Sequence, residues 1–588
     1  MNWNFNLLYK DNDSFESDVN FVNEKTNLVS NFKGKLADLK VMNEYLELQD
    51  QLDLKLSKLF TYSHMKYDQN QKNNESLLRY QKIYSLYMNI VKESSFFEPE
   101  VIEIGYNKIK EMIEKEPNLA KYQYMFDKIF NGQSHILSSD KEELLANYNG
   151  ALRNFNDLYD QLAVADNKDR EVALSDGSKL MINSSNYTSY LAEVKGQEDR
   201  RKIFNSLYQF YDNHKNTFAT IYKGIIDTNI ARMKSRNYDS VLSLYLSGNK
   251  IPNAVFHNLI DVARHENKGV KKYLELRKKY FGLEDIYTFD RFLEMSNYVK
   301  KYSFEEAKDL YYKAIDSLGN EEFSSIARYV TEDGRIDVEI KDGKRSGAYS
   351  TGTYEEGPFI LLNFTNTLDD CFTLAHECGH SGHTTLANRN QPIATANYVI
   401  FVAEVASTFN EQLLLDYLLK NSQDRDLKIS ILQNAIDGLI ATFFRQTLFG
   451  EYEYLAHQEV LDGKGVTSQS LSKIMIDLYK DYYGYDLSKE PLKQFVWCYI
   501  PHLFHTPFYV YQYATSFSAS LNIYQRVKNG EAGAFEQYLN LLRSGGSDYP
   551  INLLKNVGVD LTTKDPFESV VARLDELVNE LEKVLGEK

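Results

Sequence analysis

The stretch FTLAHECGHSGHTTLA (372–387) gathers three of the chain's eleven histidines beside a glutamate, among small and apolar residues. Its centre, His376-Glu377-Cys378-Gly379-His380, has the HExxH spacing. Positions four apart share one face of a helix, so the two imidazoles can bind one zinc ion at about 2.0–2.1 Å. Glu377 follows the first histidine, where its carboxylate can act as general base to a zinc-bound water. The stretch therefore predicts a helix that carries half of a metal site.

A solvated helix face with two histidines and a glutamate is the competing interpretation of this motif. HExxH arises by accident in about 1–2% of chains of this length, so the spacing alone is only suggestive. Phe372, Leu374 and Ala375 would make a poor exposed face, and polar groups embedded in such a helix need partners. The neighbours therefore favour a metal site.

A third ligand is needed, because a catalytic zinc commonly has three protein ligands and one open position. The metzincin pattern fails here, since His383 stands where that pattern has glycine and Leu386 where it has histidine. We expect His383 to be a hydrogen-bonded wall residue. Glu404 lies within IFVAEVA, where a carboxylate is costly unless it is paired or bound to a metal. A salt-bridged glutamate is the alternative, but Glu404 is the better third ligand.

The rest of the chain indicates a mainly α-helical protein. It has ten prolines, with none between Pro117 and Pro252 or between Pro392 and Pro491, and helices tolerate such long proline-free runs. Residues 328–364 break the helical pattern with alternating apolar residues, two Asp-Gly turn signals and the run PFILLNF. We therefore expect a small sheet immediately before the histidine-rich helix.

Two further elements of organisation are expected along the chain. Residues 174–187 are rich in Ser, Asn and Gly and indicate a turn or short hairpin. We divide the chain into an N-terminal helical lobe, 1–195, with a sub-boundary near 110–117, and a catalytic region, 196–588. The Gly-Gly pair in RSGGSDYP (543–550) lacks the ending of a phosphate loop, so nucleotide binding is not expected there.

Composition narrows the classes of partner and compartment. The net charge of −16 disfavours nucleic acid and anionic membranes, and no signal peptide or run of eighteen apolar residues is evident. Three cysteines cannot form a disulfide framework and fit a reducing compartment, so we expect a cytoplasmic protein. Buried packing is the better interpretation of all three, Cys371, Cys378 and Cys498.

Taken together, these stretches resemble the zinc peptidases of the thimet oligopeptidase family, and most closely the oligoendopeptidase F branch. The resemblance is carried by FTLAHECGHSGHTTLA and by FVAEVASTFNEQLL, in which Glu404 lies 24 residues after His380. It covers residues 200–586 strongly, and the N-terminal third fits the family's helical lobe with weaker motifs. Five other stretches agree: GKRSGAYSTG (343–352), PFILLNF (358–364), TFFRQTLFGEYE (442–453), PFYVYQYAT (507–515) and SGGSDYP (544–550).

The resemblance implies a mainly α-helical bowl with a deep central channel and a small sheet beside the HExxH helix. It implies one zinc ion per chain, held by His376, His380 and Glu404, with Glu377 as the base. The expected activity is hydrolysis of internal bonds in short peptides by a zinc-bound water that Glu377 activates. The oligomeric state is left open.

Substrate-contacting residues also follow from the resemblance, which includes a histidine followed by tyrosines. In PHLFHTPFYVYQY the matches are Tyr509 as oxyanion donor and Tyr513 as substrate contact; four residues apart, they would share a face of a helix. The histidine is His502, which follows the Ile-Pro of the branch's pattern, or else His505. The small sheet, at Gly347 and Ala348, would offer an edge strand to the peptide backbone.

Three points stay open at this stage. Thr408 stands where a thermolysin-like arrangement has aspartate, so either Glu411 or Asp370 could orient a ligand histidine. An exopeptidase of the dipeptidyl carboxypeptidase type would use the same scaffold, given a basic residue to hold a terminal carboxylate. A further interpretation is a non-catalytic, metal-containing peptide-binding protein. The presence of Glu377 and the tyrosines argues against it.

Overall fold

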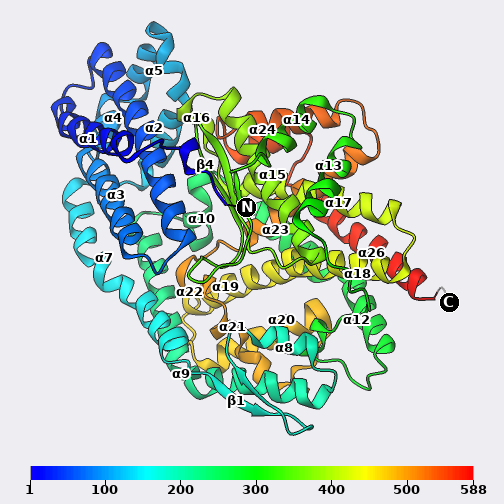
Figure 1. Ribbon diagram of the computed structural model, residues 1–588. Coiled ribbons are helices and arrows are strands. Elements are labelled where there is room, and N and C mark those ends of the chain that lie inside the picture. Colours follow the sequence, from blue (N-terminus) through cyan, green and yellow to red (C-terminus); the bar gives the residue numbers. More distant parts are fainter. Residues whose placement is uncertain (1, 587–588) are drawn as a thin grey trace. The chain divides into compact units, whose positions relative to one another are not determined.

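α-Helices form most of the protein, as the sequence predicts (Figure 1). The computed structural model describes residues 2–586, apart from the side chains at 139, 140, 142, 143, 146 and 149. The chain forms two compact units, each built from three separate segments of sequence. Unit 1 comprises 1–133, 299–418 and 520–559, and unit 2 comprises 134–298, 419–519 and 560–588. The expected division at residue 195 therefore differs from the division into compact units.

Unit 1 begins with a layer of helices. They are α1 (Asn12–Val29), α2 (Leu39–Gln69), α3 (Asn74–Glu93), α4 (Phe97–Ile104), α5 (Tyr106–Lys115) and α6 (Gln123–Gly132). Their apolar faces form one core, which also receives Phe359 and Leu361 from the sheet. The Trp3 indole donates to the Ile360 carbonyl at 2.8 Å, which ties the N-terminus to the same strand. The sheet is thus fixed on one side by the N-terminal helices.

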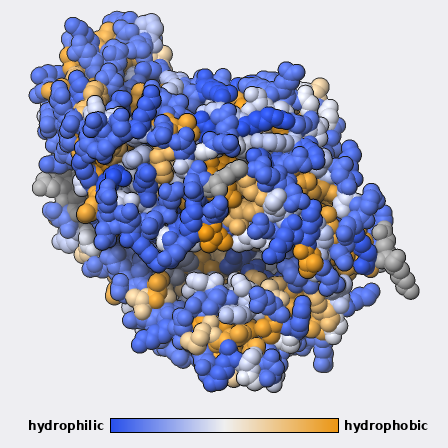
Figure 2. Space-filling view, viewed as in Figure 1, coloured by the Kyte–Doolittle hydropathy of each residue, from blue (hydrophilic) through white to orange (hydrophobic). Residues whose placement is uncertain are grey.

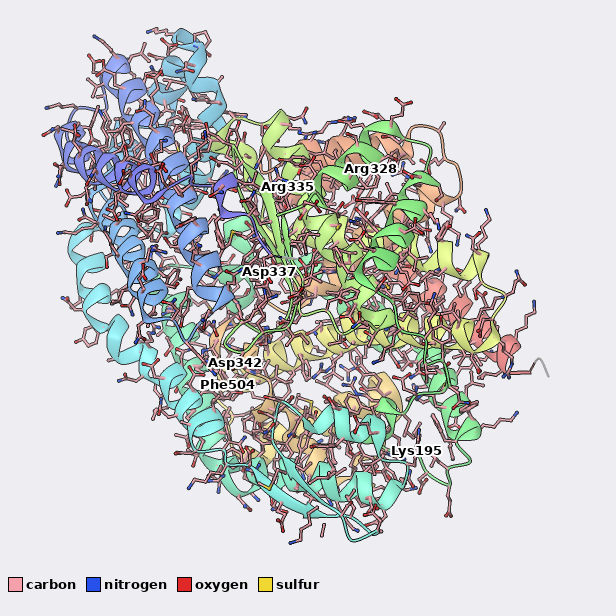
Figure 3. The ribbon with its side chains drawn as sticks, viewed as in Figure 1. Lys195, Arg328, Arg335, Asp337, Asp342 and Phe504 are labelled. Atoms are coloured by element: carbon pink, nitrogen blue, oxygen red, sulfur yellow. The ribbon has the colours of Figure 1, made fainter. Side chains whose placement is uncertain are left out.

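The predicted sheet has three strands, β3 (Ile336–Asp337), β4 (Tyr349–Thr353) and β5 (Gly357–Leu361), in the order β3-β5-β4. β4 pairs antiparallel with β5, and β3 pairs parallel with it. The predicted turns at both Asp-Gly pairs are confirmed, because Gly334 and Gly343 have φ of 86° and 79°. Arg335 and Asp337, labelled in Figure 3, lie at the β3 side of this sheet.

The remaining helices of unit 1 carry the HExxH motif and pack around it. They are α13 (Phe304–Asp316), α14 (Glu321–Val330), α15 (Leu368–Asn390), α16 (Ile393–Ala396), α17 (Ile400–Asn421), the second half of α23 (Tyr511–Lys528), α24 (Ala534–Arg543) and α25 (Pro550–Asn556). α15 contacts β4 and β5 on one side and α13, α14 and α24 on others. The HExxH helix is consequently surrounded by structure, as a rigid site requires.

Unit 2 is also helical, with one hairpin, β1 (Arg170–Ala173) and β2 (Lys179–Ile182), which confirms the predicted turn. Its first helices are α7 (Ser139–Asp160), α8 (Tyr187–Glu193), α9 (Gln197–Ser235), α10 (Val241–Leu246), α11 (Asn253–His265) and α12 (Lys268–Tyr280). The later ones are α18 (Arg425–Leu439), α19 (Gln446–Leu461), α20 (Ser468–Tyr483), α21 (Val496–Tyr499), α22 (His502–His505), the first half of α23 and α26 (Asp565–Gly586).

One continuous helical stretch of unit 2, Arg425–Leu461, is long and apolar enough to cross a membrane by length and composition. It comprises α18, a π-helical turn at Ile440–Arg445, and α19. The stretch packs against α26, α20, α11 and α9, as a core helix does. Figure 2 shows hydrophilic side chains over most of the face in view, with hydrophobic ones in smaller patches, in keeping with a chain that is 26% charged.

Candidate metal centre and active site

α15 presents its two histidines on one face, as the HExxH spacing predicts. The helix begins at a capping box, in which the Thr367 hydroxyl accepts from the Asp370 amide and the Asp370 carboxylate accepts from the Thr367 amide. One turn apart, the rings of His376 and His380 lie 4.8 Å centre to centre, and their Nε2 atoms are 3.1 Å apart. Two ring nitrogens are thus aimed at the same point.

Glu404 on α17 completes the cluster. Its Oε2 lies 3.4 Å from Nε2 of His376 and 3.5 Å from Nε2 of His380. The close approach of α17 depends on Gly379, because a Cβ there would come within 2.5 Å of the Ala406 carbonyl oxygen and 2.6 Å of the Ser407 Cα. The glycine inside HECGH therefore lets the two helices bring the three ligand groups together.

A second set of contacts orients these groups. Glu411, two turns beyond Glu404 on α17, accepts a hydrogen bond from Nδ1 of His376. In the neutral ring this contact holds the proton on Nδ1, so that Nε2 carries the lone pair that faces the cluster. The Ser407 hydroxyl donates to Oε2 of Glu404 at 3.0 Å. Asp370 is engaged in capping α15, and Glu411 is the one of the two that contacts His376; the sequence alone left this choice open.

The cluster contains more carboxylates than imidazoles. Burial by itself would lower the pKa of His376, but Glu411 and Glu404 raise it well above its usual value. Burial would raise the pKa of Glu404, yet hydrogen bonds with His376 and His380 hold it well below the usual range. The carboxylates of Glu404, Glu411 and Glu377 thus lie around the imidazoles of His376 and His380. A divalent cation would neutralise this excess of carboxylates.

The donor set fits a metal ion. The ligand atoms of His376, His380 and Glu404 all lie within 4.8 Å of one another. A tetrahedral ion with ligands at 2.0–2.2 Å would separate them by about 3.3–3.6 Å, which is close to the observed 3.1–3.5 Å. Two histidines and one carboxylate also leave one position open, as catalytic zinc sites do.

Glu377 lies beside the cluster and is only 6% exposed. Burial raises its pKa, while His376 and His380 act in the opposite direction. Its Oε2 is buried and has no hydrogen-bond partner among residues 2–586. A carboxylate left in this state, next to His376 in the chain, is available to accept a proton.

His383 is a buried wall residue, as expected, but it is not hydrogen-bonded. Its ring stacks on Tyr398 at 3.6 Å between centres, and neither ring nitrogen has a hydrogen-bond partner within the described chain. Burial lowers the pKa of His383 to about 3, so the ring is neutral. The expectation of a hydrogen bond was wrong, because the ring packs face to face on Tyr398 and its in-plane nitrogens contact no polar group of the described chain.

Gly347 and Ala348 lead directly into β4, which is an edge strand of the described sheet. Gly347 is exposed, with φ of 83° and open space where a Cβ would lie. Lys344, just before it, is buried against the Asp337 carboxylate at 2.7 Å. That ion pair anchors the turn that leads into β4, whose own residues are half-buried or buried.

The histidine and tyrosines predicted to contact substrate come together in unit 2. Tyr509 lies 5.6 Å from Tyr513 and 6.2 Å from His502, measured between ring centres, and the His502 and Tyr509 rings are nearly parallel. The prediction that Tyr509 and Tyr513 share a helix was wrong, because α23 begins at Tyr511. Phe508, with φ of 54°, interrupts the helical path just before Tyr509. Tyr511 is core packing, as expected, at 3% exposure.

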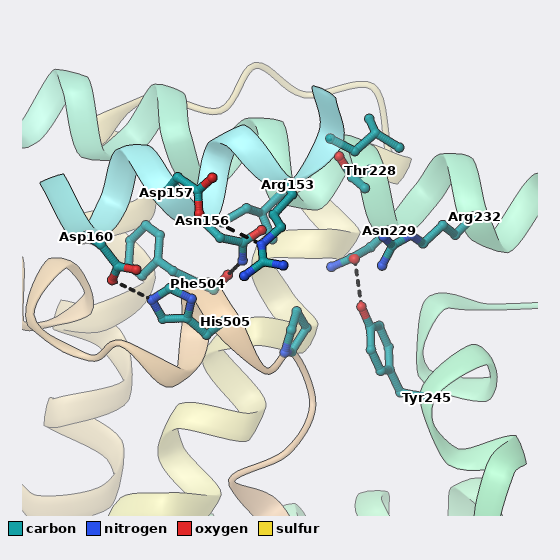
Figure 4. Close-up of a pocket in the computed structure, with 13 residues that line it drawn as sticks. Arg153, Asn156, Asp157, Asp160, Thr228, Asn229, Arg232, Tyr245, Phe504 and His505 are labelled. Carbon is teal, nitrogen blue, oxygen red and sulfur yellow. Dashed lines mark hydrogen bonds and ion pairs between the residues drawn. The ribbon is translucent and has the colours of Figure 1, made fainter. Parts of the chain in front are cut away.

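His505 contacts Asp160 of α7 (Figure 4). Its Nε2 lies 2.9 Å from Asp160, on the wall of a pocket of about 420 Å³ between α7, α9, α10 and the end of α22 with Pro507 after it. His502, in contrast, lies against both tyrosines, and burial and Arg445 lower its pKa. The structure thus groups His502 with the tyrosines and leaves His505 apart from them.

Comparison with known proteins identifies the family. A sequence profile of Peptidase family M3 matches residues 190–572, and one described as Oligopeptidase F matches residues 100–168. The chain belongs to peptidase family M3, in the oligoendopeptidase F branch. This M3 peptidase thus carries a His-His-Glu cluster that could hold a metal ion.

Relatives of this M3 peptidase match over nearly its whole length. It is 33% identical to Oligopeptidase PepF of Bacillus subtilis over 99% of the chain and 87% of the relative. It is 32% identical to Group B oligopeptidase PepB of Streptococcus agalactiae over 99% of the chain and 97% of the relative. The crystal structure of oligoendopeptidase-F from Enterococcus faecium superposes with a TM-score of 0.76 at 28% identity, covering 98% of this chain and all of that one.

Proposed function

We propose that the protein is a zinc-dependent endopeptidase that hydrolyses internal peptide bonds of short oligopeptides. The observation that carries the proposal is the convergence of His376, His380 and Glu404 beside the buried Glu377. Family membership supports peptide hydrolysis, and the names of the relatives from Bacillus subtilis and Streptococcus agalactiae describe oligopeptidases. The chemistry of the donor set supports zinc, at one ion per chain.

Each residue of the cluster then has a role. His376, His380 and Glu404 would hold the metal, which when bound supplies Lewis-acid chemistry toward the peptide carbonyl and lowers the pKa of water. Glu377 accepts the proton of the attacking water and returns it to the departing amine. Glu411 accepts from Nδ1 of His376, which leaves Nε2 as the nitrogen that would bind the metal. Burial raises the pKa of Glu377, which makes it a better proton acceptor than an exposed glutamate.

Negative charge develops on the carbonyl oxygen during attack, and a hydrogen-bond donor aimed at that oxygen stabilises the transition state. We assign this donor to the hydroxyl of Tyr509, with Tyr513 in contact with substrate. His502, stacked on Tyr509, holds its ring in place and is the histidine of the pair that we assign to catalysis. The edge of β4, from Gly347 and Ala348, would pair with the peptide backbone. A cytoplasmic location stays a prediction.

The test is incubation of the pure protein with a mixed library of short peptides, with and without a metal chelator. Internal cuts that disappear with chelator and return with zinc are the expected result. Release of terminal dipeptides alone would instead indicate a dipeptidyl carboxypeptidase. Peptide binding without cleavage would indicate a non-catalytic peptide-binding protein, and metal analysis of the same sample reports which ion is held.

A further inference from the structure

Phe508 has a backbone conformation that its residue type disfavours. Its φ is 54°, in the left-handed region, where a Cβ is crowded by the following carbonyl, and it is only 2% exposed. A bulky residue stays in this region only where the surrounding structure determines it. Because Tyr509 is the next residue, whatever holds Phe508 also sets the direction in which Tyr509 leaves the turn.

Glu453 of α19 holds the Phe508 backbone. Its Oε1 accepts a hydrogen bond from the Phe508 amide at 3.0 Å, and the carboxyl group is 1% exposed. The two residues are 55 positions apart in sequence, so the contact is purely tertiary. Burial raises the pKa of Glu453 to about 8, so the group is mostly neutral at pH 7. A neutral acceptor is sufficient for this bond, because the donor is an uncharged amide.

A chain of hydrogen bonds fixes the surroundings of Glu453 across three helices. His457 donates from Nδ1 to the Glu453 carbonyl at 2.7 Å and accepts at Nε2 from the Asn229 amide at 3.1 Å. The Tyr245 hydroxyl in turn donates to Oδ1 of Asn229 at 2.7 Å, a bond visible on the wall of the pocket in Figure 4. Burial lowers the pKa of His457 to about 4, which keeps the ring neutral and able to accept.

The ring of Phe508 is enclosed by two residues of this hydrogen-bonded chain, His457 and Tyr245, and by Phe256. It lies 5.2 Å from the His457 ring, 5.5 Å from the Tyr245 ring and 6.0 Å from the Phe256 ring, centre to centre. The backbone bond to Glu453 and the ring contacts together leave Phe508 one conformation. The next residue, Tyr509, leaves this anchor with its amide bonded to the Thr506 carbonyl at 3.2 Å.

We propose that Glu453 is the positioning residue for Tyr509, acting through the backbone of Phe508. The inference rests on the proposed function, since it assigns Glu453 to the placement of the oxyanion donor. It also gives a role to the end of TFFRQTLFGEYE (442–453), a stretch that the metal site does not use. Glu453 touches no substrate in this role, so it affects the rate only through the placement of Tyr509.

The experiment compares Glu453→Met, Glu453→Gln, Tyr509→Phe and the double variant Glu453→Met/Tyr509→Phe. Methionine fills a similar volume without the acceptor, whereas glutamine keeps an acceptor oxygen. Loss of alignment should lower kcat of Glu453→Met by about 10- to 100-fold with KM changed by less than about 3-fold. Glu453→Gln should stay within about 3-fold of wild type, and Glu453→Met should add less than about 3-fold to the loss in Tyr509→Phe.

Two results would overturn the proposal. One is a kcat for Glu453→Met equal to that of wild type. The other is a loss of the same factor in the Tyr509→Phe background, which would mean that Glu453 acts independently of Tyr509. If Glu453→Met does not fold, Tyr245→Phe replaces it. This variant removes the outer bond of the chain and should lower kcat by about 3-fold, with no further loss in Tyr509→Phe; an unchanged kcat contradicts the proposal.

Hydrogen exchange separates this proposal from the proposed function. Amide exchange over 506–513 should accelerate at least about 10-fold in Glu453→Met and remain as in wild type in Glu453→Gln, with α15 unchanged in both. Unchanged exchange over 506–513 in Glu453→Met overturns the positioning role whatever the activity. A wild-type protein without chelator-sensitive cleavage would contradict the proposed function, and the exchange result would still decide whether Glu453 holds the segment.

Discussion

The His-His-Glu cluster and the tyrosine segment are held in place by different means. His376, His380 and Glu404 project from regular helices, and their mutual distances follow from helix periodicity and from one close helix crossing at Gly379. Tyr509 precedes its helix and is placed by the left-handed Phe508, whose amide is bound by Glu453. Residue spacing in the sequence is therefore enough to predict a site on helix faces, whereas the geometry of a site on a turn depends on side chains from distant parts of the chain.

Removing a metal ligand should have the largest effect. In His380→Ala the cluster keeps two ligands, and we expect bound metal and peptide cleavage to be lost together. Metal analysis and a peptide cleavage assay on the same sample measure this. The exposed Glu355 provides a control, Glu355→Gln, which should keep both. Full metal content with full activity in His380→Ala would contradict the ligand assignment.

Removing the base should separate metal binding from catalysis. Glu377→Gln preserves size but removes the proton acceptor, so kcat should fall by about 10²–10⁴-fold while the metal and peptide affinity are retained. Steady-state kinetics and metal analysis test this. A kcat within about 3-fold of wild type would show that Glu377 is not the base.

The tyrosine segment should contribute a smaller factor. Tyr509→Phe removes one hydroxyl, and we expect kcat to fall on the order of 10²-fold with little change in KM, metal content or fold. Tyr511→Phe serves as the matched control, because Tyr511 is packed in the core. If the loss appears in Tyr513→Phe and not in Tyr509→Phe, the role of oxyanion donor moves to Tyr513.

Weakening the contact that orients His376 should lower metal affinity more than the rate of the catalytic step. Glu411→Gln removes the negative charge that polarises the ring, so metal affinity should fall by about 10- to 100-fold. Competition with a chelator of known affinity measures the change. Asp370→Asn is the comparison, since Asp370 caps α15 and should affect the stability of the helix but not the metal affinity. Equal losses in both would contradict the role of Glu411.

The support for the tyrosine segment should show a distinct dependence of stability on pH. Glu453 has a pKa of about 8 in the folded protein against about 4.5 when unfolded, so the stability that it contributes is full below pH 4.5 and is lost as pH rises to 8. The groups that face it do not titrate between pH 5 and 8, because burial lowers the pKa of His457 to about 4 and raises that of Tyr222 well above 10 and that of Tyr245 to about 12.

Measured unfolding temperatures should therefore fall from pH 5 to pH 8 more steeply in wild type than in Glu453→Gln. The difference corresponds to a few kcal/mol at most, at about 1.4 kcal/mol for each unit of pKa shift. Curves of equal slope for the two proteins would mean that Glu453 is charged at neutral pH in the folded state.

The sequence by itself determined the local parts of this protein. Helix periodicity gave the shared face of His376 and His380, and an isolated carboxylate in an apolar helix gave Glu404. The proline-free runs predicted the helical class, and the Asp-Gly pairs predicted the turns around β3. These signals are local, because backbone propensity and the pattern of buried residues act over a few turns.

Only the tertiary structure decided what depends on residues far apart in sequence. It showed that Glu411, and not Asp370, contacts His376. Asp370 caps α15, whereas helix packing brings Glu411 to the histidine. It placed Tyr509 outside α23, directly after Phe508, whose amide donates to Glu453 from 55 residues along the chain. It grouped the chain into compact units of three segments each, whereas the sequence predicted consecutive regions with a boundary at residue 195 and a sub-boundary near 110–117. Contacts between segments far apart in the chain leave no periodic pattern in the sequence, so they could be identified only from the folded structure.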